Sequence, residues 1–383
     1  GKVPQPDLDV FDPNVPFCIE NVGDVPVEIG LYNETEDVRD QCVYSYDLKT
    51  WQNYKILPNE SISTPIVLSN NGDRVYIKAS FHDVAPKFGT TRFYLLNESA
   101  NTKIRARGNI ASLNDVDENE YKLNYLTAPK YCYYEMFKDC TSLVQGPDLP
   151  ATNLETQSYF RMFYGCTSLV QAPNLPAEVL TESCYDDMFR KCTGLVTPPT
   201  ISAKTLAKYC CRDMFADCTS LTQAPALPAT TLAEYCYENM FARCTSLTQA
   251  SELPATILAP ACYYGMFAYC TSLTQAPKLP ATKLANICCL QMFCYCTSLT
   301  QAPELPATTL ADSCYKSMFS GCTSLTQAPE LPAKWLLEYC YQWMFDGCTK
   351  LNYVKCLATN GFTSTGCTTG WLRDVSSTGT FEC

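Results

Sequence analysis

The chain has little of what most enzymes and nucleic-acid-binding proteins depend on. Its 383 residues include a single histidine, His82. Charged residues make up 17% of the chain, and the net charge is −11. Because phosphate binding needs clustered lysine and arginine, this balance argues against nucleic acid and anionic membrane surfaces as partners. No apolar run reaches the roughly 18 residues of a transmembrane segment, and no signal peptide is recognisable.

Residue patterns for catalysis and metal binding are also missing. No carboxylate pair recurs in a special setting, and no nucleophile is accompanied by a base and an orienting group. No Cys-x-x-Cys pair lies close to another, and His82 stands apart from the cysteine-rich region. We therefore predict no catalytic residue, no metal site and no cofactor, and we interpret the chain as non-enzymatic.

What the chain does contain is a fixed repeat. All nine methionines are followed by phenylalanine, and these Met-Phe pairs recur every 26 residues from Met136 to Met344. A constant period between about 20 and 50 residues is typical of a solenoid, in which each repeat stacks on its neighbours. The sequence therefore predicts a solenoid over residues 131–351.

The repeat at Leu232–Ala259 shows the elements that we expect. Apolar residues four apart, such as Cys236 and Met240, predict a short helix that ends near Ala242. The apolar spacing then changes to three, which favours a tight turn and a short strand of a parallel sheet. Leu253-Pro254-Ala255 turns the chain back, because proline lacks the amide hydrogen that a central strand needs. Each repeat is thus predicted as short helix, turn, short parallel strand and return.

The Phe-x-x-Cys-x-x-Leu core of the repeat, as in Phe215, Cys218 and Leu221, is followed by a short strand and a proline. This pattern resembles the BspA-like leucine-rich repeats of surface proteins of gut bacteria (Bacteroidales) or their phages. The segments Gly108–Leu113 and Trp371–Phe381 resemble pieces of the same family. The resemblance implies an α/β solenoid, a leucine-rich repeat array of nine 26-residue units. Two departures, the longer repeat and Ala-Pro in place of an isoleucine-rich strand, predict short strands and a weakly regular sheet.

Residues 1–105 differ in kind from the array and predict a small antiparallel β-sandwich. Asn70-Asn71-Gly72-Asp73 is a hairpin signal. We expect an N-terminal cap at 106–130 and a C-terminal cap at 352–383, because the ends of a solenoid need covers that prevent edge-to-edge pairing. The predicted strands, which are β-branched and aromatic runs between turn residues, are Val25–Leu31, Val43–Trp51, Ile62–Leu68, Arg74–Phe81 and Arg92–Leu96.

Cysteine is unusually abundant, with 25 residues, of which nine occupy one repeat position and eight another. We interpret these two sets, Cys140 to Cys348 and Cys132 to Cys340, as buried ladders of thiols. Disulfides within the ladders are the alternative, because equivalent residues on neighbouring rungs lie about 4.8 Å apart. Cys18 and Cys42 form a possible disulfide in the N-terminal region. Three cysteines at less regular positions are predicted to be partly exposed: Cys211, Cys289 and Cys294.

The residues that vary most between repeats lie just before and just after Met-Phe, while CTSLTQAP recurs almost unchanged. We predict that the variable residues form a strip on one side of the solenoid, where large aromatics would anchor a ligand. Relaxed selection at solvent-facing positions is the alternative. The predicted ligand-binding residues are Tyr164, Arg212, Arg243, Tyr264, Tyr269, Tyr295, Lys316 and Trp343. A second set is interpreted as a side-chain ladder along the sheet. The alternative is that these residues bind a repeating ligand. They are Gln145, Gln171, Gln223, Gln249, Gln275, Gln301 and Gln327.

The leading hypothesis is a non-enzymatic adhesion or recognition protein, extracellular on a bacterial cell surface, that binds a host-surface protein or glycan along the array. A structural phage virion protein, such as a fibre, spike or decoration protein, is the alternative. The start at Gly1, without methionine, favours a processed or trimmed form. The sequence leaves the ligand identity and the oligomeric state open.

Overall fold

The computed structural model describes residues 6, 10–33, 41–58, 64–80, 91–113 and 125–382. His82, Cys383 and parts of the predicted N-terminal strands and cap lie outside these residues. The chain divides into two compact units. Unit 1 comprises residues 1–177 and 192–200, and unit 2 comprises residues 178–191 and 201–383.

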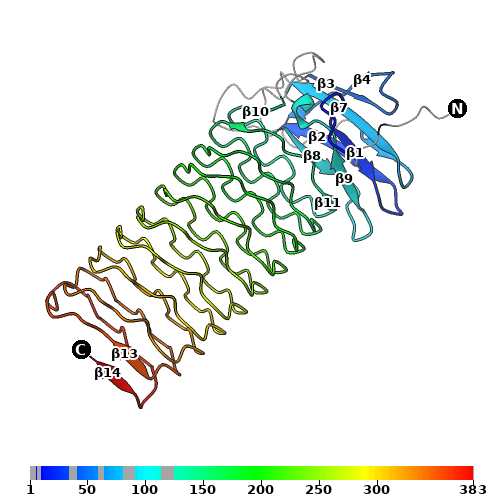
Figure 1. Ribbon diagram of the computed structural model, residues 1–383. Coiled ribbons are helices and arrows are strands. Elements are labelled where there is room, and N and C mark those ends of the chain that lie inside the picture. The colour runs from blue at the N-terminus through cyan, green and yellow to red at the C-terminus, as the bar shows by residue number, and fades with distance from the viewer. Residues whose placement is uncertain are drawn as a thin grey trace. The chain divides into compact units, whose positions relative to one another are not determined.

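The N-terminal part of unit 1 contains two β-sheets (Figure 1). Most strands pair antiparallel, and the exceptions are β9 with β11 and β2 with β5. The larger sheet has the order β11 (Leu143–Gln145), β9 (Ile104–Arg107), β1 (Cys18–Asn21), β7 (Arg74–Ser80), β3 (Gln41–Ser45) and β4 (Gln52–Asn53). The smaller sheet contains β5 (Leu57–Pro58), β2 (Val27–Asn33), β6 (Ile66–Leu68) and β8 (Thr91–Leu95).

The five runs predicted as N-terminal strands overlap β2, β3, β6, β7 and β8. By contrast, β1 was not predicted, because all four of its residues are buried and it shows no alternation of apolar and polar residues. The turn at Asn70–Asp73 forms, with Gly72 at φ 84° and the Asp73 N–H donating to the Asn70 carbonyl at 3.1 Å. It joins β6 and β7, which belong to different sheets, so the predicted hairpin is wrong.

The structure does not bring Cys18 and Cys42 together. Cys18 in β1 pairs with Tyr76, and Cys42 in β3 pairs with Ala79. Since β1 and β3 lie on opposite sides of β7, the two Cα atoms are separated by two strand spacings of about 4.8 Å each. A disulfide needs Cα atoms within about 7 Å. The possible disulfide is therefore not formed between these two positions.

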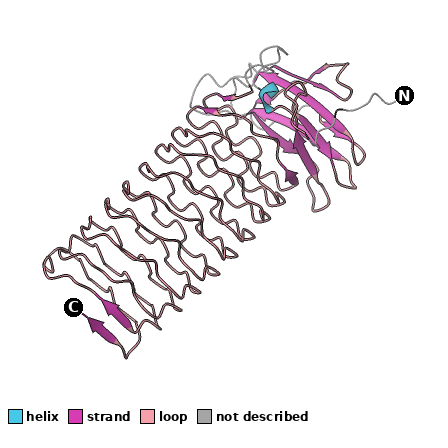
Figure 2. Ribbon diagram, viewed as in Figure 1, coloured by secondary structure: helices cyan, strands magenta, loops and turns pink. Residues whose placement is uncertain are grey.

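The helix predicted in every repeat is wrong. Residues 125–382 are described without a gap, and they contain no α-helix (Figure 2). In the first repeat the N–H of Met136 donates to the Tyr133 carbonyl, three residues back, whereas the N–H of Phe137 donates to Met162 of the next repeat at 2.9 Å. This alternation runs from Tyr131 to Cys140 and recurs in the later repeats. We call the segment the turn ladder, and each 26-residue repeat a coil.

A left-handed residue at every fourth position explains why the ladder replaces the helix. In the first coil these are Tyr131, Glu135 and Asp139, with φ of 60°, 53° and 59°. A positive φ breaks the α-helical pattern, because Cβ approaches the following carbonyl oxygen at a cost of about 1–2 kcal/mol per residue. The hydrogen bonds between coils offset this cost, and they are available only when the chain stacks on itself. Apolar residues four apart fit the ladder as well as they fit a helix.

Two columns of parallel backbone contacts complete the coil. The first aligns the glutamine position, as in Gln223 with Gln249 and Gln275 with Gln301. The second runs along the return segment and includes β10 (Thr127–Ala128) with β12 (Asn153–Leu154) in unit 1. Most of these contacts are single-residue bridges, because proline follows closely and supplies no N–H. The predicted short strands and weakly regular sheet are confirmed.

The core of the array is made of ladders of identical side chains. The nine Met-Phe pairs are buried, and Phe241 stacks between Phe215 and Phe267 with ring centroids 5.5 Å away on each side. The cysteines of the first position are buried too, and the thiols from Cys166 to Cys348 each donate to a backbone carbonyl, as Cys244 does to Phe215 at 3.1 Å. Those of the second position are buried except Cys132.

The prediction that Cys211, Cys289 and Cys294 are partly exposed is wrong, since all three are buried. Cys211 and Cys289 occupy the ladder position that holds buried tyrosines such as Tyr237 in other coils. Each of these two cysteines therefore takes the place of a buried tyrosine ring. Their exposure was predicted because these positions carry other residues in neighbouring repeats, and that variation does not indicate exposure here.

Both ends of the array continue into the flanking segments. In unit 1 the last strand of the N-terminal region, β9, pairs with β11 of the first coil, and Phe93 stacks on Phe137 at 5.5 Å. The expected boundary at residue 105 thus lies inside one compact unit. At the other end, residues 352–382 add a further coil, with β13 (Tyr353–Lys355) parallel to β14 (Thr380–Glu382). No helix of the described residues is long and apolar enough to cross a membrane.

Candidate binding surface

The turn ladder presents a column of outward side chains at its last left-handed position. We call this the outer column, and in unit 2 it consists of Lys191, Asp217, Arg243, Tyr269, Tyr295, Gly321, Gly347 and, after a one-residue shift in the last coil, Asp374. The backbone is the same at each step: Arg243 donates its N–H to Ala268 at 2.8 Å, and Tyr295 donates to Ser320 at 2.7 Å. Since every side chain is compatible with one backbone, the column is free to vary in chemistry.

Exposed aromatic rings stand on the later coils of unit 2. Tyr269 and Tyr295 stack with ring centroids 5.0 Å apart and planes 7° from parallel. They are 41% and 46% exposed, and Trp343 is 37% exposed. Cations lie over these rings, with Arg243 5.3 Å from the Tyr269 centroid and Lys316 5.3 Å from that of Trp343. The rings are held in place by stacking, which is what an aromatic anchor requires.

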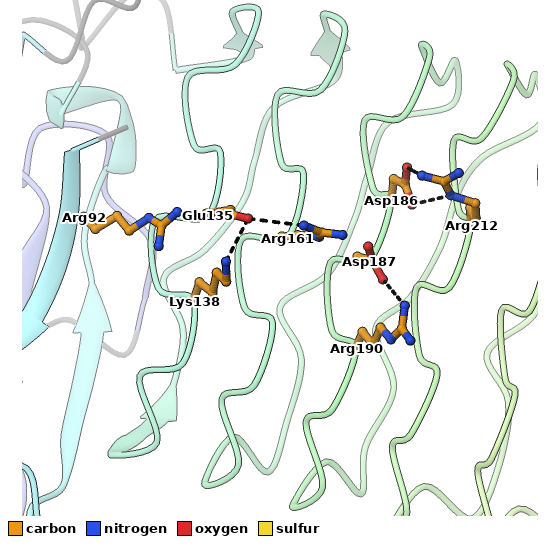
Figure 3. A network of polar contacts seen from close by, with 8 residues as sticks. All are labelled: Arg92, Glu135, Lys138, Arg161, Asp186, Asp187, Arg190 and Arg212. Atoms are coloured by element: carbon orange, nitrogen blue, oxygen red, sulfur yellow. Dashed lines mark hydrogen bonds and ion pairs between the residues drawn. The ribbon is translucent and has the colours of Figure 1, made fainter. Parts of the chain in front are cut away.

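The earlier coils of unit 2 carry a network of charges instead (Figure 3). Arg212 binds Asp186 through two hydrogen bonds of 3.1 and 2.8 Å, although the Asp186 side chain is fully buried. Arg190 binds Asp187 at 3.1 Å and lies 3.6 Å from Asp213. Burial raises the pKa of Asp213 to about 6, with Asp187 adding to the effect and Arg190 opposing it.

Unit 1 has its own charged cluster around the first coil (Figure 3). Glu135 is buried and accepts from Lys138 at 3.1 Å, and it lies 3.6 Å from Arg161. Arg92 of β8 also binds this carboxylate, so the N-terminal sheets and the first turn ladder share one ion-pair cluster. Tyr164 is half-buried beside it, with the Arg161 guanidinium 5.8 Å from its ring.

The eight predicted ligand-binding residues all lie on turn ladders. Arg243, Tyr269, Tyr295 and Trp343 are exposed. The remaining four, Tyr164, Arg212, Tyr264 and Lys316, are half-buried. Arg212 is engaged by Asp186, so its first role is structural. Contact with a ligand stays a prediction for the whole set.

The strip predicted from sequence included Gly321 and Gly347 but not Arg373 or Asp374, which lie beyond the predicted array. The two glycines were visible as variable positions beside Ser320 and Asp346. Their placement in one column with the stacked tyrosines depends on the 26-residue register, which could have shown it.

The predicted glutamine ladder lies on another face of the coil. Its members are aligned by the parallel bridges, and those from Gln171 onward are exposed. A shallow groove on this face is lined by Thr300, Gln301, Thr326, Gln327 and Pro329, among others. Among the residues that the structure describes, no group of three or more His, Cys, Asp or Glu is arranged to hold a metal ion.

A comparison with protein families identifies the array. The family model for the BspA type leucine-rich repeat region, which has six copies, matches residues 161–287 and again 262–367. Together these matches span more than half of the chain. The chain belongs to the BspA-type leucine-rich repeat family. BspA-type domains are generally surface adhesion or protein-binding modules and are usually surface-exposed. Neither the curated proteins nor the solved structures include a match to this chain.

Proposed function

We propose that the protein is a non-enzymatic adhesion or recognition protein that acts outside the cell, on a bacterial surface, and binds a host-surface protein or glycan along the turn ladders of its array. The observation that carries this proposal is the exposed pair Tyr269 and Tyr295, stacked at 5.0 Å on a rigid backbone ladder. Exposed aromatic rings with fixed orientation lose little entropy on binding, so they serve as anchors at protein interfaces.

The contrast between inward and outward positions supports the same function. Inward positions repeat Met, Phe and Cys from coil to coil, and these residues are buried. Outward positions of the ladder change from charged to aromatic to glycine while the backbone hydrogen bonds persist. A scaffold with a constant core and a diversified face is suited to recognition.

The test compares two triple variants of equal size. One truncates the exposed aromatics, Tyr269→Ala, Tyr295→Ala and Trp343→Ala. The other truncates the glutamine face, Gln249→Ala, Gln275→Ala and Gln301→Ala. Binding to host cells or to an extract of their surface is measured by flow cytometry or biolayer interferometry. We expect the aromatic variant to weaken binding by roughly tenfold or more, since each anchor contributes above about 1 kcal/mol.

The glutamine variant should bind like the wild type. If it loses binding while the aromatic variant keeps it, the recognition face is the sheet and the assignment to the turn ladder is wrong. Loss in neither variant would exclude both faces.

A further inference from the structure

The outer column of unit 2 is interrupted by glycine on two successive coils. Tyr269 and Tyr295 are followed by Gly321 and Gly347, and then by Asp374, since the last coil is shifted by one residue. The glycines have φ of 75° and 73°. This conformation alone does not require glycine, because Tyr269 and Tyr295 adopt φ of 62° and 57° at the same position. What glycine contributes here is the missing side chain.

The missing side chains leave open space over Gly347, beside Tyr295, and we call this space the slot. A Cβ atom built on Gly321 would lie 2.6 Å from Cδ1 of Tyr295, so this ring rests against the glycine backbone. A Cβ atom on Gly347 would meet nothing within 4 Å except the backbone of Gly321, at 3.7 Å. If the stack continued, its next ring would come from position 321 and lie over Gly347. That place is open, and one wall of it is the outer face of Tyr295.

Asp374, the next member of the outer column, borders the slot on the side opposite Tyr295, and the Arg373 guanidinium lies 3.8 Å from its carboxylate. The Arg373 guanidinium binds the Asp346 carboxylate through two hydrogen bonds of 2.7 Å. Arg373 remains 61% exposed in this pair. The pair offers a hydrogen-bond donor and an acceptor within one coil of the glycine floor.

We propose that the slot over Gly347 binds a saccharide ring, which stacks on Tyr295 and hydrogen-bonds to Asp346 and Arg373. This inference rests on the proposed function and specifies its ligand class. A sugar ring has a face of C–H groups, which matches the negative face of an aromatic ring. Its hydroxyls both donate and accept, as the carboxylate and guanidinium require.

Other planar groups fit this slot less well. The guanidinium of a partner's arginine would find the Asp346 and Asp374 carboxylates already paired with Arg373, whose like charge disfavours a second cation at close range. A plain aromatic side chain would cover the Asp346–Arg373 pair without replacing the hydrogen bonds that these groups make to water. The saccharide is the class that uses both the apolar wall and the polar border.

The experiment uses the whole chain and a panel of neutral and acidic oligosaccharides. Binding is first detected by saturation-transfer NMR, and the affinity of the best binder is then measured by calorimetry. Tyr295→Ala should weaken it by roughly tenfold or more, whereas Tyr295→Phe, which keeps the ring, should stay within about threefold. The double variant Gly321→Tyr, Gly347→Tyr continues the stack and should abolish binding. Thermal unfolding checks that each variant folds. If the double variant does not fold, the affinity of Tyr295→Ala alone decides the test.

Several outcomes would overturn the proposal. These are no binding by any saccharide of the panel, unchanged affinity in Tyr295→Ala, and binding that survives in the folded double variant. A parallel arm measures wild-type binding to host cells whose surface glycans have been oxidised with periodate. Binding that persists there, yet is lost when Tyr269, Tyr295 and Trp343 are truncated, would refute the saccharide and favour a protein ligand, while the proposed adhesion function stands. Absence of both cell binding and saccharide binding would refute both.

Discussion

Two stretches of the turn ladder in unit 2 use one backbone for different chemistry. The earlier coils carry Asp186, Arg212 and Asp213, held in a partly buried ion-pair network. The later coils carry the exposed Tyr269–Tyr295 stack, followed by glycine. In both stretches the N–H of the outward residue donates to the next coil, at 2.8 Å for Asp213 and 2.7 Å for Tyr295. These hydrogen bonds between coils come from the backbone, so they form with either kind of outward side chain.

The shared core beneath both stretches should give the largest effect. Met240 and Phe241 are fully buried, and Phe241 stacks on both neighbours. Replacing both with alanine should destabilise the array by about 4–10 kcal/mol, at roughly 2–5 kcal/mol per side chain. Because a coil is supported mainly by its neighbours, urea unfolding should separate into more than one transition or start at much lower urea. A single transition with an unchanged midpoint would argue against stacked coils. Phe241→Leu, which keeps most of the volume, is the matched control and should cost far less.

The register of the array was predictable from sequence, but the conformation of its ladder was not. The Met-Phe period fixes which residues align, and this is enough to place Tyr269, Tyr295 and Gly321 in one column. The left-handed residues at every fourth position were not predictable, because Asp213, Tyr235 and Trp343 all adopt positive φ and share no side-chain feature that demands it. Only hydrogen bonding to the next coil favours the ladder over a helix, and apolar periodicity within one repeat does not report that contact. Cys211 and Cys289 were misplaced for another reason, because variation between repeats was taken as a sign of exposure at a position that is buried in every Met-Phe repeat.

The two stretches should respond differently to the loss of an arginine. Arg212→Ala leaves the buried carboxylate of Asp186 without its partner, and we expect a loss of about 2–3 kcal/mol at pH 7.5, below the usual range for buried pairs because Arg212 is itself partly exposed. Arg243→Ala removes a cation from the exposed Tyr269 ring and should cost only about 0.5 kcal/mol. Urea unfolding of both variants provides the comparison.

The Arg212 effect should also shrink in acid. Burial raises the pKa of Asp186 to about 6 even though Arg212 opposes it, so the carboxyl takes up a proton more readily once the arginine is gone. Two results would mean that the Asp186–Arg212 pair does not stabilise the charged coils. One is an equal loss of unfolding free energy in Arg212→Ala and Arg243→Ala, and the other is a loss in Arg212→Ala that grows below pH 6.

The cysteine ladder runs beneath both stretches and should give an intermediate effect. The Cys244 thiol donates to the Phe215 carbonyl at 3.1 Å and is fully buried. Cys244→Ala removes the sulfur and this donor, and it should cost about 1–2 kcal/mol. The protein is alkylated without reduction and analysed by mass spectrometry. Most thiols of the array should be protected from alkylation in the native protein and alkylated after denaturation. Recovery of disulfide-linked peptides instead would show that the array is disulfide-bonded.

The smallest effect concerns pH and should be confined to the charged coils. Burial raises the pKa of Asp213 to about 6 and that of Glu238 to about 7, with nearby carboxylates adding to both shifts and Arg190 and Arg212 opposing them. In the unfolded chain these carboxyls return to their ordinary pKa values of about 4. Between about pH 4 and 7 the folded state therefore binds more protons than the unfolded state, and stability falls as pH rises through this window.

The size of the pH effect is limited because Glu238 is only partly buried and solvent screens its interactions. Because of Asp213 and Glu238, we expect the free energy of unfolding to be about 1 kcal/mol higher at pH 5 than at pH 7.5. The double variant Asp213→Asn, Glu238→Gln should lose most of that difference. Urea titrations at the two pH values measure it. Tyr269→Ala and Tyr295→Ala lie on the aromatic coils and serve as controls, whose pH dependence should match that of the wild type. A double variant that keeps the full pH dependence would place the titrating groups elsewhere and remove this distinction between the two stretches.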